Sequence, residues 1–327
     1  MARREFAVGS RGSLLARRQT ELALDTLRRA HPDARFQLRT VTTTGDRSQA
    51  SLAEIGGRGV FVVELERALL DGEIDVAVHS LKDMPSGSTE GLTVAAVSER
   101  ADVRDVLVSR DGLTLGALPA GAVVGTGSPR RAAQLLAARP DLRVADIRGN
   151  VDTRIRKVED GDYDATVLAA AGLARLGWLD RASEILPAEV MLPAVGQGAL
   201  ALQVRAADAE AAALVAAVGH APTERATAAE RAFEARLGGG CHSAIAAHAV
   251  ILRRRATKNL GEAFSETSAS SVRGAFLRLR GLVADPGGGR LLRDEIEGPA
   301  AEAEALGTRL AKTLIAQGAS AILEATS

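Results

Sequence analysis

Residues 74–85 read Ile-Asp-Val-Ala-Val-His-Ser-Leu-Lys-Asp-Met-Pro, and this stretch decides the fold class. Apart from Asp75, residues 74–78 are apolar and predict a buried β-strand, because strands covered on both faces carry near-continuous Val, Ile and Leu. A helical pattern closed by Gly72 comes directly before it. Strands that alternate with helices predict an α/β fold, in which ligands bind beyond the carboxyl ends of the strands. Lys82 and Asp83 follow such an end, so the stretch also predicts a site, although an adjacent Lys-Asp pair could be a surface pair.

The alternation of strands and helices continues on the N-terminal side. Residues 5–10 predict a strand and residues 13–30 an amphipathic helix, with Gly-Ser-Arg-Gly-Ser at 9–13 as the turn between them. Ser13 is a suitable N-cap, because its hydroxyl can accept a hydrogen bond from the first turn of the helix. Such a turn presents backbone N–H groups and the positive end of a helix dipole, which favour an anion. Many α/β turns share this form without a ligand, so the turn alone leaves both interpretations open.

A second unit of the same kind follows. Residues 123–131 read Val-Val-Gly-Thr-Gly-Ser-Pro-Arg-Arg and predict a strand, a turn and a helix start, with Ser128 as N-cap and Pro129 at the first helical position. The two arginines in the first turn, Arg130 and Arg131, oppose the helix dipole. A negative group would offset them, so we expect an anion site here.

Arginines follow the next two strands as well. Arg148 comes after the strand expected at 142–147, Arg154 lies in the following helix, and Arg175 comes after the strand expected at 164–171. Lysine occupies only four of the 41 basic positions, so any one arginine could be a solvated surface residue. Their shared place at the ends of strands is harder to attribute to composition, and arginine binds carboxylates and phosphates bidentately. We therefore expect a ligand with several carboxylates or phosphates.

The single cysteine, Cys241, follows three glycines at 238–240 and precedes an apolar, strand-like run. Three glycines leave room beside the sulfur for something large, at an entropic cost when they are ordered. The alternative is a buried and inert packing cysteine, and from this stretch both stay open. His242 is a poor base for the thiol, because neighbours on an extended strand point to opposite faces. One cysteine and five histidines without ligand spacing predict no metal site.

The composition is that of an ordinary globular chain with two or three domains. Of the 327 residues 46% are apolar and 25% are charged, and the formal net charge is zero. A neutral chain gives no reason to expect nucleic acid or a membrane surface as a partner. No stretch resembles a signal peptide or a membrane span, so we expect a cytoplasmic protein. Residues 46–59 predict a mobile loop over a cleft, and residues 257–271 predict a flexible insertion.

Together these motifs resemble the porphobilinogen deaminase (hydroxymethylbilane synthase) family over nearly the whole chain. The segments that carry the resemblance are VGSRGSLLARRQ at 8–19, GGRGVFVVELE at 56–66, HSLKDMP at 79–85, GTGSPRR at 125–131, RGNVDTR at 148–154, residues 169–177, residues 192–200 and GGC at 239–241. The resemblance implies an α/β monomer of three domains, of which the first two are periplasmic-binding-protein-like lobes with mixed, mostly parallel sheets. The third is a small α+β domain with an antiparallel sheet. The implied boundaries are 1–98 plus 198–218, 99–197, and 219–327 with an insertion near 253–273.

The resemblance also implies an activity and a cofactor in tetrapyrrole and heme biosynthesis. A dipyrromethane group built from two porphobilinogen units would be joined to Cys241 by a thioether, and four further porphobilinogens would be added head to tail and released as 1-hydroxymethylbilane. Asp83 would be catalytic, hydrogen-bonding the pyrrole N–H groups and stabilising the cation left when ammonia departs. The residues that would bind the cofactor are Cys241, Lys82, Asp83, Thr126, Ser128, Arg130, Arg131 and Arg154. Those that would bind the substrate or the growing chain are Arg11, Ser13, Arg148 and Arg175.

The chain departs from the family pattern in three places. After Cys241 it has His-Ser-Ala where Gln-Val-Pro is common, Pro129 stands where Leu or Val is common, and Ala-Leu-Gln at 201–203 stands where Gly-Ile-Glu is usual. From the residues alone a second class of function stays open. This is a binding protein that clamps a small anion between two lobes and keeps Cys241 as a structural residue.

Overall fold

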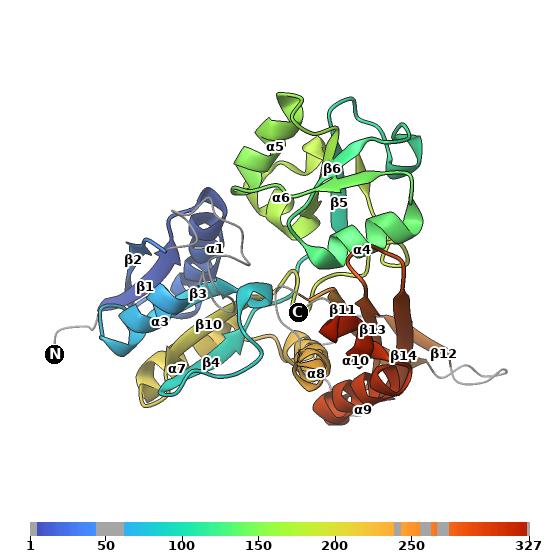
Figure 1. Cartoon of the computed structure of the whole chain (residues 1–327). Helices are drawn as coiled ribbons and strands as arrows, with labels where there is room; N and C mark the ends of the chain where they lie inside the picture. The colour runs from blue at the N-terminus through green and yellow to red at the C-terminus, as the bar shows by residue number, and fades with distance from the viewer. Residues whose placement is uncertain (1–4, 44–61, 239–242, 256–262, 267–274, 326–327) are drawn as a thin grey trace. The chain divides into compact units, whose positions relative to one another are not determined.

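The structure of the protein is a computed structural model, which describes residues 5–43, 62–238, 243–255, 263–266 and 275–325. The chain divides into two compact units (Figure 1). Unit 1 contains Met1–Gly127, Asp141–Pro187 and Gln197–Gly219, and unit 2 contains Ser128–Pro140, Ala188–Gly196 and His220–Ser327. The loop expected at 46–59 and the predicted anchor Cys241 lie outside the described residues.

The first sheet of unit 1 has five strands in the order β2-β1-β3-β10-β4. They are β1 (Glu5–Arg11), β2 (Arg35–Val41), β3 (Val76–Ser80), β4 (Leu92–Val97) and β10 (Leu200–Arg205). β1 is parallel to β2 and β3, whereas β10 is antiparallel to β3 and β4. β10 returns the chain to this sheet from the second one and lies between β3 and β4.

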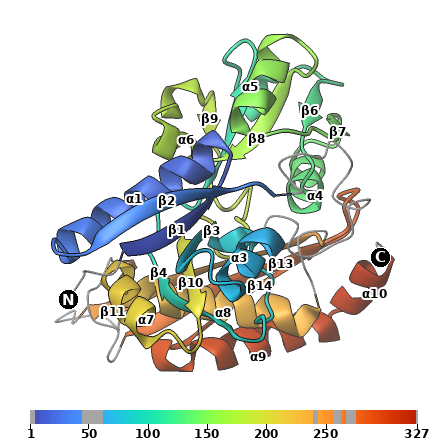
Figure 2. The ribbon, with the colours of Figure 1, turned by 90° about the vertical axis from the view of Figure 1, so that its left-hand side faces the viewer.

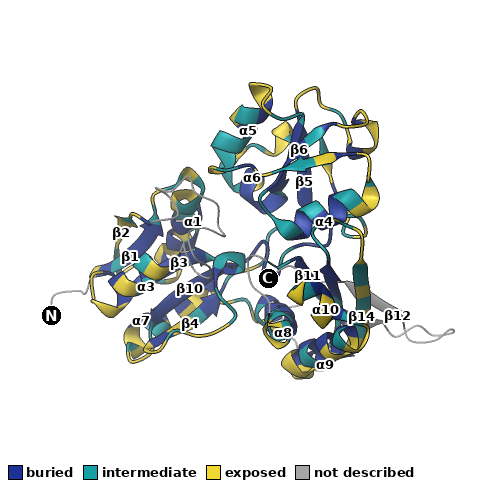
Figure 3. Ribbon diagram, in the orientation of Figure 1, coloured by how far each residue is buried: buried dark blue, intermediate teal, exposed yellow. Residues whose placement is uncertain are grey.

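Helices cover both faces of the first sheet (Figure 2). On one face lie α1 (Leu14–Ala30), α7 (Ala209–Val215) and the 3-10 turn η4 (Ala216–Val218), and on the other lies α3 (Val63–Leu70). Val76 and Val78 of β3 pack against Leu24, whereas Ala77 between them packs against Leu65. Because alternate residues of a strand face opposite sides, β3 is buried almost throughout, and so is β10 (Figure 3).

The second sheet of unit 1 has an equivalent order, β7-β6-β8-β5-β9. Its strands are β5 (Asp105–Ser109), β6 (Val123–Gly125), β7 (Arg143–Ala145), β8 (Ala165–Ala169) and β9 (Glu184–Ile185), with 3-10 turns η2 (Leu115–Ala117) and η3 (Leu179–Arg181). β6 is parallel to β7 and β8, and β5 is antiparallel to β8 and β9. Helices α5 (Val151–Glu159) and α6 (Ala170–Leu176) pack on the sheet through Ile155 and Leu173. These two mixed sheets confirm the predicted α/β class.

Unit 2 is built on an antiparallel sheet in the order β12-β11-β13-β14. The strands are β11 (Ile245–Arg255), β12 (Ala263–Glu266), β13 (Phe276–Ala284) and β14 (Leu291–Pro299). The helical elements are α4 (Pro129–Ala138), α8 (Ala221–Leu237), the 3-10 turn η5 (Ala300–Glu302), α9 (Ala303–Ala316) and α10 (Ala319–Glu324). Phe233 of α8 packs so closely on the sheet that a Cβ at Gly281 would lie 2.6 Å from its Cζ. On the other face Ala133 of α4 packs with Ala246 and Leu282. The predicted antiparallel sheet of the C-terminal region is confirmed.

One expectation about the C-terminal region was wrong. Residues 263–266 lie within the stretch expected to be a flexible insertion, yet they form β12, which pairs with the end of β11 at 252–255. In the sheet, β12 lies on the edge of β11 opposite to β13, so it pairs with backbone groups of β11 that point away from β13. The remainder of the expected insertion lies outside the described residues.

The two predicted helix caps differ. Ser13 caps α1 as expected, and its Oγ accepts a hydrogen bond from the Ala16 N–H at 3.3 Å. Ser128 occupies the N-cap of α4, but its side chain makes no capping hydrogen bond, and Pro129 at the next position has no N–H to offer. The helix that Ser128 begins belongs to unit 2, although the expected boundaries placed it with residues 99–197.

Candidate functional site

Asp83 lies just beyond the carboxyl end of β3, as predicted. The strand ends at Ser80, and the chain continues into the 3-10 turn η1 (Leu81–Asp83). Leu81 is buried, and its N–H donates to the carbonyl of Ala199 at 3.0 Å. Lys82 and Asp83 stay partly exposed. The buried leucine therefore anchors the turn, while the carboxylate is presented at the edge of the sheet where α/β folds bind ligands.

A buried glutamine connects this turn to the second sheet. Gln197 is 1% exposed, and its Oε1 accepts a hydrogen bond from Lys82 Nζ at 3.3 Å. Its Nε2 donates to the carbonyl of Val103 at 2.7 Å and to Asp105 Oδ1, at the start of β5, at 2.9 Å. Residues 192–200 were quoted above only as a segment that carries the family resemblance, and a role for Gln197 was not predicted. The available signal was a single amide side chain between two glycines in an apolar run.

Arg175 is bound by Gly198, the residue that directly follows Gln197. Its Nη2 donates to the carbonyl of Gly198 at 2.6 Å, and its own carbonyl accepts a hydrogen bond from Arg18 Nε at 3.3 Å. Burial lowers the pKa of Arg175 to about 10, so the side chain remains a cation at neutral pH. Gln197 thus binds Lys82, which follows β3, and Gly198 binds Arg175, which lies in the helix after β8. The structure brings these two predicted site residues to adjacent positions of the segment between Leu192 and Leu200.

Arg11 and Ser13 belong to the same edge of the first sheet as Asp83. Arg11 is the last residue of β1, and Ser13 is the N-cap of the helix that follows. β1 and β3 are parallel neighbours, so their carboxyl ends meet at one edge. The charge of Arg11 reaches His79 of β3, whose pKa falls to about 4, mainly because the ring is buried and in smaller part because of Arg11.

Three more predicted residues follow parallel strands of the second sheet. Thr126, directly after β6, is buried, and its N–H donates to the carbonyl of Ala145 at 2.9 Å. Arg148 Nε pairs with Asp146 Oδ2 at 2.9 Å, and Arg154 Nε donates to the carbonyl of Gly149 at 2.8 Å. These local contacts orient two guanidinium groups around the turn that follows β7.

Ser128, Arg130 and Arg131 lie in unit 2, at the start of α4. Both arginines are buried, with 4% and 6% of their surface exposed. Arg130 Nη1 donates to the carbonyl of Leu192 at 2.5 Å, and Gln134 Nε2 donates to the same carbonyl at 3.1 Å. We expected a ligand to offset the charge of Arg130. In the structure a backbone carbonyl of the 188–196 linker contributes to this, which the sequence did not indicate.

The elements on either side of Cys241 are tied together by one buried carboxylate. α8 ends at Leu237, with Gly238 in the left-handed conformation (φ 70°), and β11 begins at Ile245. Glu230 of α8 is fully buried, and its Oε1 accepts a hydrogen bond from the Ala249 N–H of β11 at 2.7 Å. Its Oε2 accepts one from the Gly196 N–H at 2.8 Å. The chain that carries Cys241 therefore starts and ends on elements that Glu230 joins.

Known proteins identify the family of this chain. It is 44% identical over 320 residues to the porphobilinogen deaminase of Brevibacillus brevis, with 98% of this chain and 96% of that protein covered. The chain belongs to the porphobilinogen deaminase family. Residues 6–213 match the model of the porphobilinogen deaminase dipyrromethane cofactor binding domain, and residues 225–316 match the C-terminal domain of porphobilinogen deaminase. The resemblance seen in the sequence motifs is confirmed.

Other solved structures are similar to this porphobilinogen deaminase family member only at a low level. The periplasmic domain of B. pertussis BvgS matches at 16% identity with a TM-score of 0.40, over 65% of this chain and 39% of that one. CbnR, a LysR family transcriptional regulator, matches at 17% identity with a TM-score of 0.41, over 64% of this chain and 67% of that one. Such low scores carry no argument, so the fold class rests on the strand orders above.

The side chains of this porphobilinogen deaminase family member fit a dipyrromethane group, which carries an acetate and a propionate on each ring. Cations and hydroxyl groups are suitable donors for carboxylates, because charge-assisted hydrogen bonds from arginine and lysine are strong. Such donors are present among the predicted cofactor residues, which are Lys82, Thr126, Ser128, Arg130, Arg131 and Arg154. Gly127 keeps the turn beside Thr126 free of side-chain bulk, since a Cβ there would lie 2.7 Å from Asp146 Oδ1.

Among the described residues of this porphobilinogen deaminase family member, no group of three His, Cys, Asp or Glu side chains is placed to hold a metal ion. In the same part of the chain, no helix is long and apolar enough to cross a membrane.

Proposed function

We propose that this protein condenses four porphobilinogen molecules head to tail onto a dipyrromethane cofactor bound to Cys241, releasing ammonia and then 1-hydroxymethylbilane. The observation that carries the proposal is the placement of charge after parallel strands of unit 1. Lys82 and Asp83 follow β3, Arg148 follows β7, and Arg175 lies in the helix after β8. The reaction needs such a set, because the substrate brings carboxylates and becomes cationic as ammonia leaves.

Asp83 is the proposed catalytic residue. Its carboxylate accepts hydrogen bonds from pyrrole N–H groups and stabilises the positive charge that develops as the bond to ammonia breaks. The turn that carries it is fixed by the backbone bond of Leu81 to Ala199 and by the bond of Lys82 to Gln197. A carboxylate held by its turn needs little reorganisation when charge develops beside it.

The cations divide into two proposed groups. Arg11, Ser13, Arg148 and Arg175 bind the carboxylates of the incoming substrate and the growing chain. Lys82, Thr126, Ser128, Arg130, Arg131 and Arg154 bind those of the cofactor. When bound, the dipyrromethane supplies the free pyrrole carbon to which the first substrate is joined. Glu230 supports the stretch that carries Cys241, because it joins the helix before the cysteine to the strand after it.

The intact mass of the purified protein tests the covalent cofactor. We expect a mass above that of the sequence by two condensed porphobilinogen units, together with the colour reaction of pyrroles with an acidic aldehyde reagent. The matched control is Cys241→Ser, which should show the mass of the bare sequence and no turnover. A wild-type protein with the bare mass and full activity would overturn the attachment at Cys241.

A second measurement addresses the alternative function, a binding protein for a small anion. Consumption of porphobilinogen with release of ammonia and formation of a linear tetrapyrrole supports the transferase. Tight binding of a dicarboxylate without any consumption of porphobilinogen would support the binding protein instead. The match to porphobilinogen deaminase over 98% of the chain favours the transferase.

We also propose that the protein acts as a cytoplasmic monomer of three domains, with the boundaries 1–98 plus 198–218, 99–197 and 219–327. Each of the three sheets lies within one of these domains, which supports the division. Light scattering after size-exclusion chromatography tests the monomer, with 33.9 kDa as the expected mass of the bare chain. A concentration-independent dimer would contradict it.

A further inference from the structure

A chain of hydrogen bonds crosses the first sheet next to the turn that carries Asp83. His79 Nε2 lies 3.0 Å from Gln203 Oε1, and Gln203 Nε2 donates to Glu66 Oε1 at 2.7 Å. The other carboxylate oxygen of Glu66 accepts a hydrogen bond from Thr89 Oγ1 at 2.9 Å. His79 and Gln203 are 5% and 3% exposed, so most of this chain is out of water.

The register of the sheet places these side chains on one face. In the antiparallel pair of β3 and β10, Ala201 lies opposite His79, and Gln203 lies opposite Ala77. His79 and Gln203 are therefore diagonal neighbours that point to the same side, and this is the side covered by α3, which carries Glu66. Thr89 lies farther along the chain, between Asp83 and β4. The chain of bonds thus joins three elements and one loop.

The direction of each hydrogen bond follows from the chemistry of Glu66. An ionised carboxylate only accepts hydrogen bonds, so the amide nitrogen of Gln203 must face it. The amide oxygen of Gln203 then faces His79, and Nε2 of that ring must carry the proton. Glu66 therefore selects the tautomer of His79 through the amide of Gln203.

The surroundings of His79 keep its ring neutral. Burial is the largest cause of its low pKa of about 4, and Arg11 on β1 lowers the pKa further. The neighbour on β10, Gln203, is uncharged, and the carboxylate of Glu66 on α3 lies beyond it. An uncharged ring with one fixed tautomer can donate one defined hydrogen bond, which suits a residue that holds backbone in place.

We propose that Glu66 and Gln203 are positioning residues for Asp83, because they fix His79 in its Nε2–H tautomer and hold both ends of the segment 80–88. His79 precedes this segment and Thr89 follows it, and Asp83 lies inside it. The inference rests on the proposed function, in which Asp83 is the catalytic carboxylate. It assigns a role in catalysis to side chains on β10 and α3 that do not touch the substrate.

Two variants of the holoenzyme test the proposal. Glu66→Gln removes the group that orients the amide of Gln203, and Gln203→Met removes both of its hydrogen bonds at similar volume. In each we expect kcat for porphobilinogen consumption to fall about tenfold while KM changes less than twofold, because Asp83 is displaced and the arginines that bind carboxylates are untouched. If one variant fails to fold by circular dichroism, the other carries the test.

The ¹⁵N chemical shifts of the His79 ring report its tautomer. These shifts would stay unchanged in the variants if Glu66 and Gln203 had only a structural role. In the wild type we expect a neutral ring protonated at Nε2 from pH 6 to 8, with the resonance assigned by its loss in His79→Leu. In Glu66→Gln the two ring nitrogens should move toward the averaged shifts of exchanging tautomers. The matched controls are Thr89→Val, with a smaller fall in kcat and an unchanged ring, and Thr93→Val at an exposed position of β4, with neither change.

The outcomes separate this inference from the proposed function. A wild-type ring protonated at Nδ1, or an unchanged kcat in both Glu66→Gln and Gln203→Met, would overturn the inference. If the wild type itself forms no tetrapyrrole, the proposed function fails, and the role in catalysis fails with it. If the wild type is active and both Glu66→Gln and Gln203→Met keep its full activity, this inference alone is refuted and the proposed function stands.

Discussion

The two sheets of unit 1 are built on the same plan, and the comparison separates what the fold requires from what the chemistry requires. In the first sheet, Asp75 stands directly before β3, its N–H donates to the carbonyl of Ala7 at 2.8 Å, and its Oδ2 accepts from the Ala7 N–H at 2.9 Å. In the second sheet, Asp164 stands before β8 and makes the same two bonds to Val123, at 2.9 Å and 2.7 Å. Each aspartate fixes the register of its parallel pair, so this part of the plan belongs to the fold.

The equivalent positions farther along the strands differ completely. His79 in β3 corresponds to Leu168 in β8, because each lies four residues after its aspartate. Lys82 and Asp83 correspond in the same way to Ala171 and Gly172. The first sheet therefore ends in a charged turn backed by a buried polar network, whereas the second ends in an apolar helix start. Function is added at the strand ends of a shared framework.

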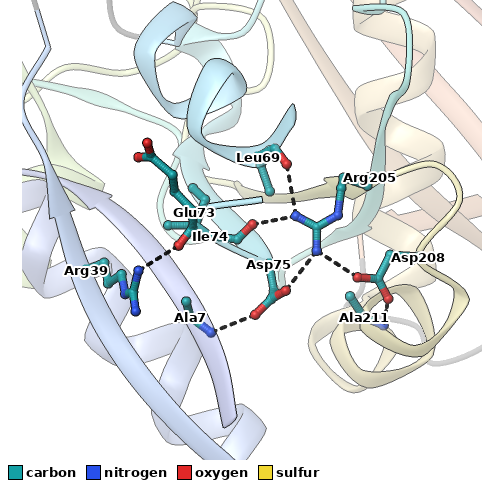
Figure 4. A network of polar contacts seen from close by, with 9 residues as sticks. All are labelled: Ala7, Arg39, Leu69, Glu73, Ile74, Asp75, Arg205, Asp208 and Ala211. Carbon is teal, nitrogen blue, oxygen red and sulfur yellow. Dashed lines mark hydrogen bonds and ion pairs between the residues drawn. The ribbon is translucent and has the colours of Figure 1, made fainter. Parts of the chain in front are cut away.

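A further pair of equivalent residues, Arg205 and Arg110, differs in burial. Arg205, at the end of β10, binds Asp75 Oδ1 and Asp208 Oδ2 at 2.8 Å and 2.9 Å and donates to the carbonyls of Leu69 and Ile74 (Figure 4). Arg110, just after β5, approaches Asp164 at 3.6 Å, with both side chains more than a third exposed. The first framework is thus joined by a partly buried arginine, and the second has only a surface ion pair at this place.

The largest expected effect comes from the charged turn. Asp83→Asn should lower kcat by at least about 100-fold, because positioned carboxylates in acid–base and electrostatic roles contribute on the order of 10² to 10⁴. The cofactor mass and the melting temperature should stay as in the wild type. The matched control is Asp71→Asn, whose side chain is 54% exposed, with an expected loss below twofold. Turnover within threefold of the wild type would remove Asp83 from the reaction.

His79 should make the stability of the protein depend on pH. Its pKa is about 4 in the folded chain and about 6.5 when unfolded, so between these values only the unfolded chain takes up the proton. The free energy of unfolding should therefore fall as the pH drops from 6.5 to 4, by up to about 3 kcal/mol from this group. Urea unfolding of His79→Leu, which copies Leu168 of the second sheet, should show a correspondingly shallower pH dependence. Parallel curves for the two proteins would contradict the assignment.

The two framework arginines should differ in the stability they provide. Arg205→Ala leaves two partly buried carboxylates without this cation and should lower the free energy of unfolding by about 2–3 kcal/mol. Arg110→Ala breaks an exposed pair and should cost less than about 1 kcal/mol. Chemical denaturation of both variants measures the difference. Equal losses would mean that the burial of Arg205 has no energetic consequence.

Smaller losses of stability than that of Arg205→Ala are expected at two glycines, each of which lies two residues after the residue bound by its framework aspartate. A Cβ at Gly9 would lie 2.4 Å from Ile74 Cδ1, and one at Gly125 would lie 2.9 Å from both Ile147 Cδ1 and Tyr163 Cδ1. Gly9→Ala and Gly125→Ala should each cost about 1–2 kcal/mol through overpacking. Removing the Cδ1 methyl of the isoleucine should restore the stability of Gly9→Ala better than that of Gly125→Ala, because Tyr163 also contacts the new methyl at 125. The rescue variants are therefore Gly9→Ala with Ile74→Val and Gly125→Ala with Ile147→Val, and equal rescue would contradict this account.

Much of the fold could be predicted from local patterns. The strand at 74–78, the helix after Ser13 and the strand-like run after Cys241 follow from periodicity and caps, which act over a few residues. β12 could not be predicted, because it pairs with the edge of β11 opposite to β13, and nothing in its own four residues requires that partner. The placement of α4 with unit 2 likewise depends on contacts that are distant in sequence.

The site could be predicted where it follows strand ends and could not where it depends on buried side chains between elements. The positions of Lys82, Asp83 and Arg148 after their strands are confirmed, whereas their roles stay predictions. Gln197 was missed, and Gln203 was noticed only as a departure from the family pattern. An amide in an apolar run has no motif and gains its meaning from partners 92 and 137 residues away. Buried polar networks are long-range features, and a single sequence does not reveal them.

The central place of β10 in the first sheet has a consequence for how the protein is made on the ribosome. β10 lies between β3 and β4, which precede it by more than 100 residues, so the first sheet stays incomplete until residue 205 has been synthesised. All five strands of the second sheet lie between residues 105 and 185 and are available earlier. The lobe with Asp83 is therefore completed last of the two, and its exposed strand edges must be protected from aggregation while translation continues.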